Sequence, residues 1–369
     1  MSVFWNNRTR NLSPYVPGEQ PRDRQFIKLN TNENPYPPSP RVIDAIAKVA
    51  GDELRLYPDP ACTSLREAVA TRYNLRPEQV FAGNGSDEVL GFAFGAFFAS
   101  SNTAEGVAPI LFPDITYSFY PVYANLWDIP YRTIPLGGDF LITTTDYMAP
   151  SGGVVIPNPN APTGTALSLG EIFSMAECLE EQGKVLILDE AYIAFAGNNC
   201  SAIGHIDRHP NLLVVHTLSK SASLAGLRVG YAVGSEPLIE GLCRIRDSFN
   251  SYTLDRLALA GAVAAVSDAA YYDETNRNVV ATRERVTEAL QGLGFTVLPS
   301  AANFVFAKAP GISGAVFFSA LRERGILVRH FNKYRIADFL RVSIGTDDEM
   351  DVFLDSCGEI ISSMARSAK

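Results

Sequence analysis

Short apolar segments that alternate with helical segments constrain the fold of this chain more than any other feature of its sequence. Mostly apolar runs predict strands at residues 80–82, 109–112, 131–134, 154–156, 185–188, 212–216 and 229–233. Helical patterns lie between several of these strands, at residues 87–99, 118–125 and 168–183. Continuous apolar strands separated by helices are typical of a parallel sheet covered on both faces. We therefore predict an α/β fold for this part of the chain.

Outside this region the pattern changes at both ends of the chain. The beginning is rich in proline, asparagine and charge, which predicts an extended N-terminal arm over residues 1–30. After residue 250, a helical stretch (254–293) and two later helices (314–324 and 347–364) accompany strands at 295–298, 303–306, 326–331 and 339–344. We predict a large domain of residues 51–250 and a smaller α+β domain of residues 31–50 and 251–369.

Two sequence signals predict where helices begin. Ser64 with Glu67, and Ser168 with Glu171, have the spacing of a capping box, in which the two side chains satisfy free backbone N–H groups. A further helix is predicted at residues 41–50 from its apolar spacing.

Polar residues of the α/β region are concentrated in turns that follow its strands. Four such turns are Gly83 to Glu88, Pro157 to Gly164, Asp189 to Tyr192, and Ser219-Lys220. In open α/β sheets, ligands bind beyond the carboxyl ends of the strands. We therefore expect the four turns to meet in one crevice.

Lys220 has the most specific chemistry of these residues. An ammonium at the end of a buried strand must be solvated, paired or neutralised. If its pKa falls, the amine becomes a nucleophile that can form a Schiff base. Asp189 is a strand-end carboxylate that needs a partner, and Tyr192 could present a phenol to the same crevice. The Gly85-Ser86 turn before a helix offers free N–H groups to a phosphate.

These groups together fit one cofactor, pyridoxal phosphate. It needs a Schiff-base lysine, an acid beside its ring nitrogen, hydrogen-bond donors for its phenolate oxygen and an anion site for its phosphate.

The composition excludes several other classes of function. The 369 residues are 47% hydrophobic and 19% charged, as in a soluble globular protein. A net charge of −9 argues against binding to nucleic acid or to an anionic membrane surface. The five cysteines are far apart and form no CxxC or Cys/His cluster, so we expect neither a metal site nor a disulfide framework. The longest apolar candidate, residues 89–99, is too short to cross a bilayer, and we expect a cytoplasmic protein.

Six motifs, in their order along the chain, carry a resemblance to a known family. They are LNTNENP from Leu29, YPDP from Tyr57, GNGSDE from Gly83, PNAPTG from Pro159, DEAY from Asp189, and SK from Ser219 with GLR from Gly226. With these motifs the chain resembles the fold-type I, pyridoxal-phosphate-dependent aminotransferases, and more narrowly their histidinol-phosphate aminotransferase group. The resemblance covers essentially the whole chain. It implies a large domain with a mainly parallel seven-stranded sheet covered by helices, a smaller α+β domain and an N-terminal arm.

The resemblance also implies roles toward the cofactor. Lys220 would be the Schiff-base lysine and proton shuttle, and Asp189 would pair with the pyridinium nitrogen. Tyr192 and Asn160 would hold the phenolate oxygen, and Tyr117 would stack on the ring. The phosphate would be surrounded by Gly85, Ser86, Asp87, Ser219 and Arg228, and by Tyr57 from the neighbouring subunit of a homodimer.

Substrate contacts follow from the same resemblance. Arg341 would grip a substrate carboxylate by a two-pronged contact that a lysine could not make. Arg329, helped by Tyr15, would meet the phosphate of histidinol phosphate, and Asn34 of the NENP motif would also face the substrate. The implied reaction passes an amino group between L-histidinol phosphate and 2-oxoglutarate, in histidine biosynthesis.

One departure from the family pattern concerns Asn160. Many relatives have an asparagine directly before the proline of PTG, where this chain has Ala161. Asn160 stands one residue earlier, and we expect it to serve if the turn shifts.

Three alternatives share part of this pattern. The same fold could act on aromatic amino acids, or as a threonine-phosphate decarboxylase that releases carbon dioxide. A cofactor-sensing regulatory module is a third, but such modules are usually fused to a DNA-binding helix-turn-helix, and this chain has no basic N-terminal domain. Arg329 favours a phosphorylated substrate over an aromatic amino acid.

Overall fold

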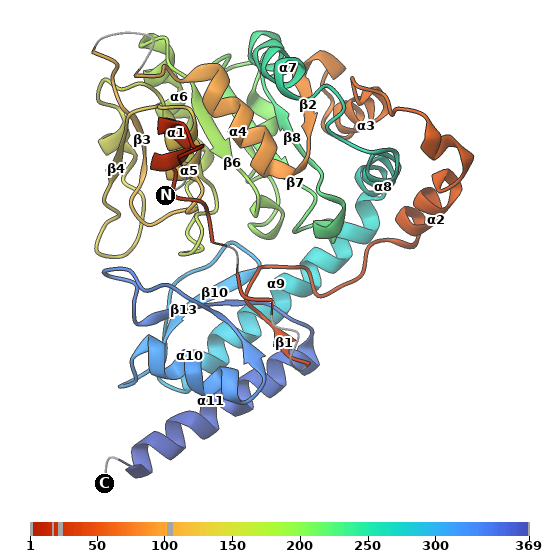
Figure 1. The fold of residues 1–369 in the computed structure, drawn as a ribbon. Helices are drawn as coiled ribbons and strands as arrows, with labels where there is room; N and C mark the ends of the chain where they lie inside the picture. Colours follow the sequence, from red (N-terminus) through yellow and green to blue (C-terminus); the bar gives the residue numbers. More distant parts are fainter. Residues whose placement is uncertain (1–2, 17, 21–24, 102–105, 368–369) are drawn as a thin grey trace.

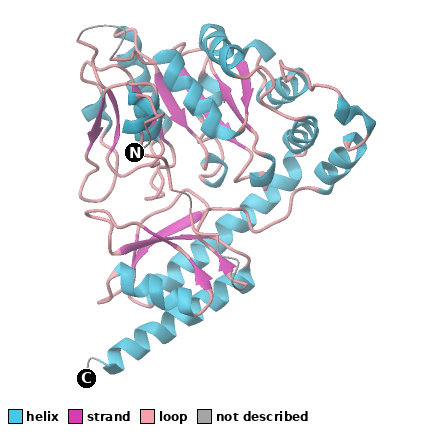
Figure 2. Ribbon diagram, viewed as in Figure 1, coloured by secondary structure: helices cyan, strands magenta, loops and turns pink. Residues whose placement is uncertain are grey.

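A computed structural model describes residues 3–16, 18–20, 25–101 and 106–367 of the chain. Pro17 and Pro21 of the predicted arm lie outside these residues. Figure 1 shows a large sheet with helices on both sides, and below it a smaller sheet flanked by long helices. Figure 2 shows the same two layers coloured by secondary structure.

The large sheet has seven strands in the order β2-β8-β7-β6-β5-β3-β4. Only β8 runs antiparallel to its neighbours, and all other pairs of adjacent strands are parallel. The strands are β2 (Val80–Gly83), β3 (Ile110–Pro113), β4 (Tyr131–Ile134), β5 (Val154–Pro157), β6 (Leu186–Asp189), β7 (Leu212–Thr217) and β8 (Gly230–Val233). The predicted α/β class with a mainly parallel seven-stranded sheet is confirmed.

Both faces of the central strands of this sheet are buried, because β5 and β6 carry apolar residues at successive positions up to Asp189 at the end of β6. Ile156 and Leu188 face one core, while their neighbours Val155 and Ile187 face a second core on the opposite side. The helices that accompany the sheet are α3 (Thr63–Tyr73), α4 (Gly85–Phe97), α5 (Tyr120–Leu126), α6 (Leu169–Glu181), α7 (Glu236–Phe249) and α8 (Arg256–Ser267), with α2 (Pro40–Val49) packed on α8.

The smaller layer contains an antiparallel sheet of four strands in the order β12-β13-β10-β9. A separate parallel pair joins β1 near the N-terminus to β11. A third core lies between these strands and the long helices. The elements are β1 (Ile27–Lys28), β9 (Thr296–Val297), β10 (Phe304–Lys308), β11 (Ile326–Leu327), β12 (Arg329–His330), β13 (Phe339–Ser343), α9 (Ala269–Gly292), α10 (Gly314–Glu323) and α11 (Asp347–Ser367).

The remaining helices are short. They are α1 (Asn7–Asn11) and the 3-10 turns Asp52–Arg55, Pro77–Gln79, Thr144–Tyr147, Ile193–Phe195, Ala202–His205 and Ala225–Leu227.

The two predicted capping boxes have opposite outcomes. Ser168 and Glu171 form the expected reciprocal pair at the start of α6. The box at Ser64 is wrong, because α3 already begins at Thr63 and its N-cap, Cys62, has left-handed backbone. The carboxylate of Asp59 instead accepts the Thr63 N–H at 2.7 Å.

Two other expectations needed correction, and one helix was missed. The helical stretch 254–293 is two helices, because the backbone turns at Asp268 between α8 and α9. The strand expected at 326–331 is divided between β11 and β12, which belong to different sheets. Helix α7 was not predicted. In the described residues, no helix is long and apolar enough to cross a membrane. The domain boundaries at residues 30, 50 and 250 stay predictions.

Candidate active site

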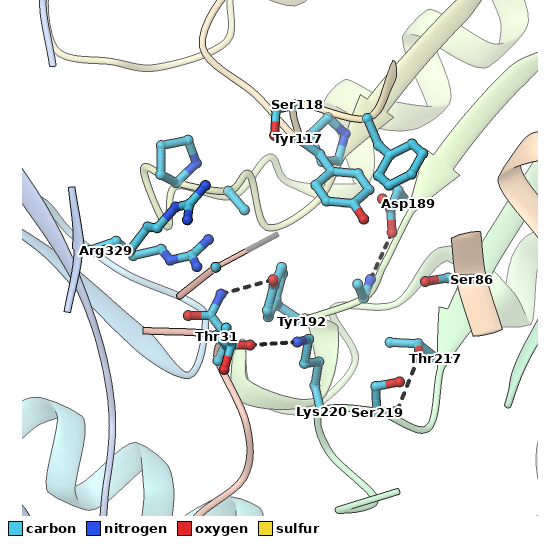
Figure 3. A pocket seen from close by; sticks show the side chains of 18 of the residues that line it. Thr31, Ser86, Tyr117, Ser118, Asp189, Tyr192, Thr217, Ser219, Lys220 and Arg329 are labelled. Atoms are coloured by element: carbon cyan, nitrogen blue, oxygen red, sulfur yellow. Dashed lines mark hydrogen bonds between the residues drawn. The ribbon is translucent and has the colours of Figure 1, made fainter. Parts of the chain in front are cut away.

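A cavity of about 540 Å³ lies at the carboxyl ends of the central strands of the large sheet. Its lining includes Pro157, Asp189 and Thr217, the last residues of β5, β6 and β7. Segments from β12, β13 and the N-terminal part of the chain close it from the other side. Figure 3 shows Asp189, Tyr192 and Lys220 around this space. The structure therefore confirms that the four turns meet at one cavity.

Lys220 follows β7, and its partly buried side chain lines the cavity. Its Nζ donates to the carbonyl oxygen of Thr31 at 2.9 Å (Figure 3). Burial lowers the pKa of this ammonium to about 8, and the charge of Arg341 acts in the same direction, while Glu33 opposes it. A substantial fraction of the amine is therefore neutral near physiological pH, which nucleophilic chemistry requires.

Asp189 ends β6 and is 5% exposed. Its Oδ2 accepts the hydroxyl of Tyr120 at 2.8 Å, and its Oδ1 accepts the N–H of Ala191 at 3.2 Å. Burial raises the pKa of Asp189 to about 6, against the opposing effect of these two hydrogen bonds. A buried carboxylate that accepts two hydrogen bonds is a suitable partner for a cationic ring nitrogen.

Tyr192 lies beside the cavity, and its ring packs edge-on against Phe304 at 5.2 Å. Its hydroxyl oxygen accepts a hydrogen bond from Asn32 Nδ2 at 2.9 Å. Burial raises the pKa of the Tyr192 phenol, so the hydroxyl keeps its proton at neutral pH.

Helix α4 begins at the cavity and presents its first backbone amides there. Gly85 has a φ of +77°, which a side chain would strain, and a Cβ at this position would lie 2.5 Å from the Arg228 guanidinium. The first amides of a helix have no intrahelical acceptor, so Gly85, Ser86 and Asp87 can donate to an anion. The close approach of Arg228 adds positive charge to this cradle.

Two acidic side chains in this turn could oppose an anion, but both have other partners. Asp87 accepts hydrogen bonds from Tyr117 at 2.7 Å and from Arg228 Nη2 at 3.0 Å. Glu88 accepts the backbone N–H of Asn84 at 2.6 Å. Arg228 also donates to the hydroxyl of Ser219 at 3.3 Å, which connects the cradle to the turn that carries Lys220.

Two arginines from neighbouring strands face the opposite end of the cavity. Arg329 of β12 is paired in register with Arg341 of β13, and both line the cavity. Like charges directly opposite each other on a sheet are destabilising without a compensating anion. Arg341 donates to the Asn30 carbonyl oxygen at 3.0 Å, but its buried Nε has no partner among the described residues. The two arginines can therefore bind an anionic group in the cavity.

Aromatic rings form another wall. Tyr117 and Tyr15 line the cavity, and Tyr15 stacks on Phe119 with ring centroids 4.7 Å apart. The Arg329 guanidinium lies over the ring of Phe331, 5.6 Å from its centroid. The cavity therefore combines flat apolar surfaces with cationic groups.

Known proteins with the same sequence pattern identify the family. The family model described as aminotransferase class I and II matches residues 24–356. The chain belongs to this family. It is 53% identical over 362 residues to a histidinol-phosphate aminotransferase of Clostridium acetobutylicum, covering 98% of this chain and 100% of that protein. Histidinol-phosphate aminotransferase 2 of Thiobacillus denitrificans is 53% identical over 356 residues, with 96% and 97% covered.

Solved structures give the same family fold. The histidinol-phosphate aminotransferase of Sinorhizobium meliloti, in complex with pyridoxal-5'-phosphate, has a TM-score of 0.87 at 26% identity and covers 99% of each chain. A Thermus thermophilus aspartate aminotransferase mutant shares the fold, with a TM-score of 0.81 at 18% identity. Class I and II aminotransferases depend on pyridoxal phosphate.

The residues of this aminotransferase fit that cofactor. The lysine with a lowered pKa, the buried carboxylate, the phenol and the helix N-terminus with Arg228 surround one cavity, as the cofactor requires. In the described residues, no group of histidine, cysteine or acidic side chains could hold a metal ion.

Four residues predicted for this site of the aminotransferase are not among those that line the cavity: Asn160, Asn34, Gly85 and Tyr57. Gly85 directly precedes Ser86, which does line it. Asn160 uses both N–H groups of its side chain elsewhere, on the Ile115 carbonyl at 3.0 Å and on Thr163 Oγ1 at 2.8 Å. Ala161 lines the cavity instead. Neither N–H group of the Asn160 side chain is therefore free for the phenolate oxygen in this arrangement, and the role expected of Asn160 stays a prediction.

Asn34 is the second residue outside the cavity lining. Its Nδ2 donates to the backbone carbonyl of Lys220 at 3.0 Å, and its Oδ1 accepts the Tyr36 N–H at 3.0 Å. The amide nitrogen of Asn34 therefore holds the Lys220 segment and its oxygen holds the following turn, so both polar groups have backbone partners outside the cavity lining. A direct contact of Asn34 with substrate stays a prediction. Tyr57 also lies away from the cavity of its own chain and is 79% exposed.

Sequence reasoning missed three residues of the site. Tyr120 donates a hydrogen bond to Asp189, and the Thr31 carbonyl oxygen accepts one from Lys220. Asn32 donates one to the Tyr192 hydroxyl. Asn32 and Thr31 belong to the LNTNENP motif, whose density of polar residues was the available signal. Tyr120 had no signal, since an aromatic residue at the start of a helix is typical of a core position.

Proposed function

We propose that this aminotransferase transfers an amino group between L-histidinol phosphate and 2-oxoglutarate, as a step of histidine biosynthesis. The observation that carries the proposal is the register pair Arg329 and Arg341 on the wall of the cavity that holds Lys220. Two adjacent guanidinium groups suit a phosphate or a carboxylate, and the relatives at 53% identity bear the name of this activity.

The cofactor of this reaction is pyridoxal 5'-phosphate. When bound, it withdraws electrons from the substrate carbon that carries the amino group. We assign Lys220 as the residue that binds it covalently, Asp189 as the partner of its ring nitrogen and Tyr192 as the hydrogen-bond donor to its phenolate oxygen. Its phosphate belongs at the α4 N-terminus, with Ser219 and Arg228, and its ring belongs beside Tyr117.

Lys220 has a second role in this proposal. A partly buried amine with a pKa of about 8 can accept a proton at Nζ and return it, because both protonation states are populated near physiological pH. The Thr31 carbonyl holds Nζ at one position by its hydrogen bond of 2.9 Å. Tyr15, Tyr117 and Phe331 line the same cavity as Lys220 and give it apolar walls.

The proposed assembly is a cytoplasmic homodimer. Tyr57 is exposed, and its ring stacks on Tyr252 at 4.6 Å, beside the exposed apolar residues Leu54 and Leu56. A second subunit on this surface would cover the apolar groups and bring Tyr57 to the partner's phosphate cradle. Five free cysteines agree with a reducing compartment.

An aromatic amino acid is the second candidate substrate. It is favoured by the stacked rings of Tyr15 and Phe119 and by Phe331 in the cavity wall. These surfaces could accept a phenyl ring as well as an imidazole ring.

Single-turnover spectroscopy of the purified holoenzyme separates the candidates. Histidinol phosphate, phenylalanine and threonine phosphate are each mixed with the enzyme, and the conversion of the bound cofactor is followed by its absorbance. We expect histidinol phosphate to react with the highest kcat/KM. A faster reaction of phenylalanine would support the second candidate, and release of carbon dioxide from threonine phosphate would contradict transamination.

A further inference from the structure

Asn32 joins the N-terminal segment, the small sheet and the active-site cavity at one buried point. Its backbone has a φ of +56°, in the left-handed region, and the residue is 1% exposed. Its backbone N–H donates to Ser343 Oγ at 2.8 Å, and Asn303 Nδ2 donates to its carbonyl oxygen at 3.0 Å. Ser343 and Asn303 are also buried, so the position of Asn32 is closely determined.

The hydrogen bonds around the Asn32 side chain fix its orientation. Ser343 Oγ accepts the backbone N–H and donates its own hydrogen to Asn32 Oδ1 at 2.9 Å. The Nδ2 group is then directed at the Tyr192 hydroxyl, to which it donates at 2.9 Å (Figure 3 shows this bond as the dashed line that ends at Tyr192). This arrangement gives each of these polar atoms a partner of the correct kind.

The Tyr192 hydroxyl is therefore an acceptor toward Asn32 and must donate elsewhere. The residues that the structure describes offer it no acceptor, and its ring lies at the cavity. Its hydrogen is left for a group inside the cavity.

The turn after β5 does not supply a second donor. Both N–H groups of the Asn160 side chain are used inside the turn, and Ala161 is the residue that faces the cavity. The donor role at the phenolate oxygen then rests on Tyr192.

We propose that Asn32 is a positioning residue of this aminotransferase, which fixes the Tyr192 hydroxyl as the hydrogen-bond donor to the phenolate oxygen of the cofactor. The inference rests on the proposed binding of pyridoxal phosphate at Lys220, but not on the identity of the substrate. A donor stabilises the phenolate form, so its loss raises the pKa at which the bound cofactor titrates.

The test is a pH titration of the visible absorbance of the holoenzyme without substrate. Asn32→Asp keeps the size and tolerates left-handed backbone, but its carboxylate accepts the Tyr192 hydrogen and turns it away from the cavity. We expect this variant to titrate about one to two pH units higher than the wild type, because a hydrogen bond to a charged group is lost. Tyr192→Phe should show a shift of the same sign and size.

The double variant distinguishes hydrogen-bond orientation from the added charge. If Asn32 acts through Tyr192, Asn32→Asp adds little in a Tyr192→Phe background. A full additional shift there would mean that the new charge acts directly, and would overturn the proposal. Asn32→Gly, which accepts the left-handed backbone without strain, should shift the titration less than Asn32→Asp.

Controls separate this inference from damage to the fold and from failure of the proposed function. Asn276→Ala removes a buried amide outside the active-site cavity and should titrate as the wild type does. If the visible absorbance of the wild type changes with pH and that of Asn32→Asp changes at the same pH, the role of Asn32 is refuted. A wild-type protein without cofactor absorbance would instead refute cofactor binding, and the inference with it.

Discussion

In the proposed function the amine of Lys220 is the reactive group, and its surroundings determine its protonation state. The side chain is partly buried, the guanidinium of Arg341 acts on it, and its Nζ has one backbone acceptor in Thr31. Burial and the arginine both disfavour the charged form, so the pKa of Lys220 falls from the usual value near 10.5 to about 8.

This lowered pKa predicts how fast the cofactor-free protein binds pyridoxal phosphate covalently. Only the neutral amine reacts, so the rate should rise about tenfold per pH unit below the midpoint and become constant above a pH of about 8. In Arg341→Met, one cause of the lowering is removed, and the midpoint should move to higher pH. The rate is measured by stopped-flow absorbance. A wild-type midpoint near that of an exposed lysine would contradict the burial of this amine.

The protonation state of Asp189 is likewise determined by its surroundings, and Tyr120 is part of them. Burial raises the pKa of this carboxyl to about 6, and the Tyr120 hydroxyl stabilises the ionised form through a 2.8 Å hydrogen bond. In Tyr120→Phe the pKa of Asp189 should rise further, by about one to two units. The cofactor-free variant would then carry mostly protonated Asp189 at pH 7.

The expected result for Tyr120→Phe is a loss of cofactor affinity by roughly tenfold at pH 7 that is partly recovered at pH 9. Equilibrium binding of pyridoxal phosphate at the two pH values measures it. Tyr147→Phe is the matched control, since the buried Tyr147 hydroxyl has no partner among the described residues. Equal losses in both variants, independent of pH, would point to packing rather than to Asp189.

Strands β12 and β13 together carry the two arginines that we propose bind the substrate. Their register places Arg329 beside Arg341, and both guanidinium groups lie over the ring of Phe331. Arg329 has no acidic partner in the described part of the chain, so its charge is available to a ligand.

Arg329→Ala should weaken histidinol phosphate by about 2 kcal/mol, because a charged hydrogen bond is lost, and should affect glutamate far less. The comparison is kcat/KM for the two half-reactions. Arg341→Lys keeps the charge but loses the two-pronged geometry, and serves as the control that should weaken glutamate clearly. Equal loss of both substrates in Arg329→Ala would indicate damage to the shared part of the site.

Local patterns predicted most elements of the fold, and the failures have physical causes. The box at Ser168 was found because its two side chains need only each other and the helix start. The box at Ser64 failed because the Asp59 carboxylate, in the preceding turn, accepts the N–H of Thr63, the first residue of α3, and that of Ala61 before it. The break at Asp268 was missed because apolar spacing continues from α8 into α9.

Over the whole molecule, the sequence predicted which strand ends converge but not which distant residues support them. Lys220, Asp189 and Tyr192 follow strands, and the parallel sheet brings them together. The bond from Asn32 to Ser343 joins residues 311 positions apart, and depends on a left-handed turn that no local signal required. The displacement of Asn160 likewise depends on acceptors that tertiary packing brings to it.

The proposed dimer makes a prediction about mixed subunits. Tyr57→Ala and Lys220→Ala subunits should each be poorly active as homodimers. After refolding together, a hybrid dimer would contain one site with intact Lys220 and the partner's intact Tyr57, so roughly a quarter of all sites should be active. Steady-state assays of the mixture measure this recovery. No recovery, with hybrid dimers demonstrated by mass, would show that Tyr57 does not act across the interface.

Covalent attachment of the cofactor to Lys220 can be measured directly. The purified holoenzyme is reduced with borohydride and digested, and the peptides are analysed by mass spectrometry. The added mass of the reduced cofactor should lie on the peptide that contains Lys220, and the visible absorbance should be lost in Lys220→Ala. Attachment to any other lysine, or a Lys220→Ala protein that is still reducible by borohydride, would contradict the assignment of this site.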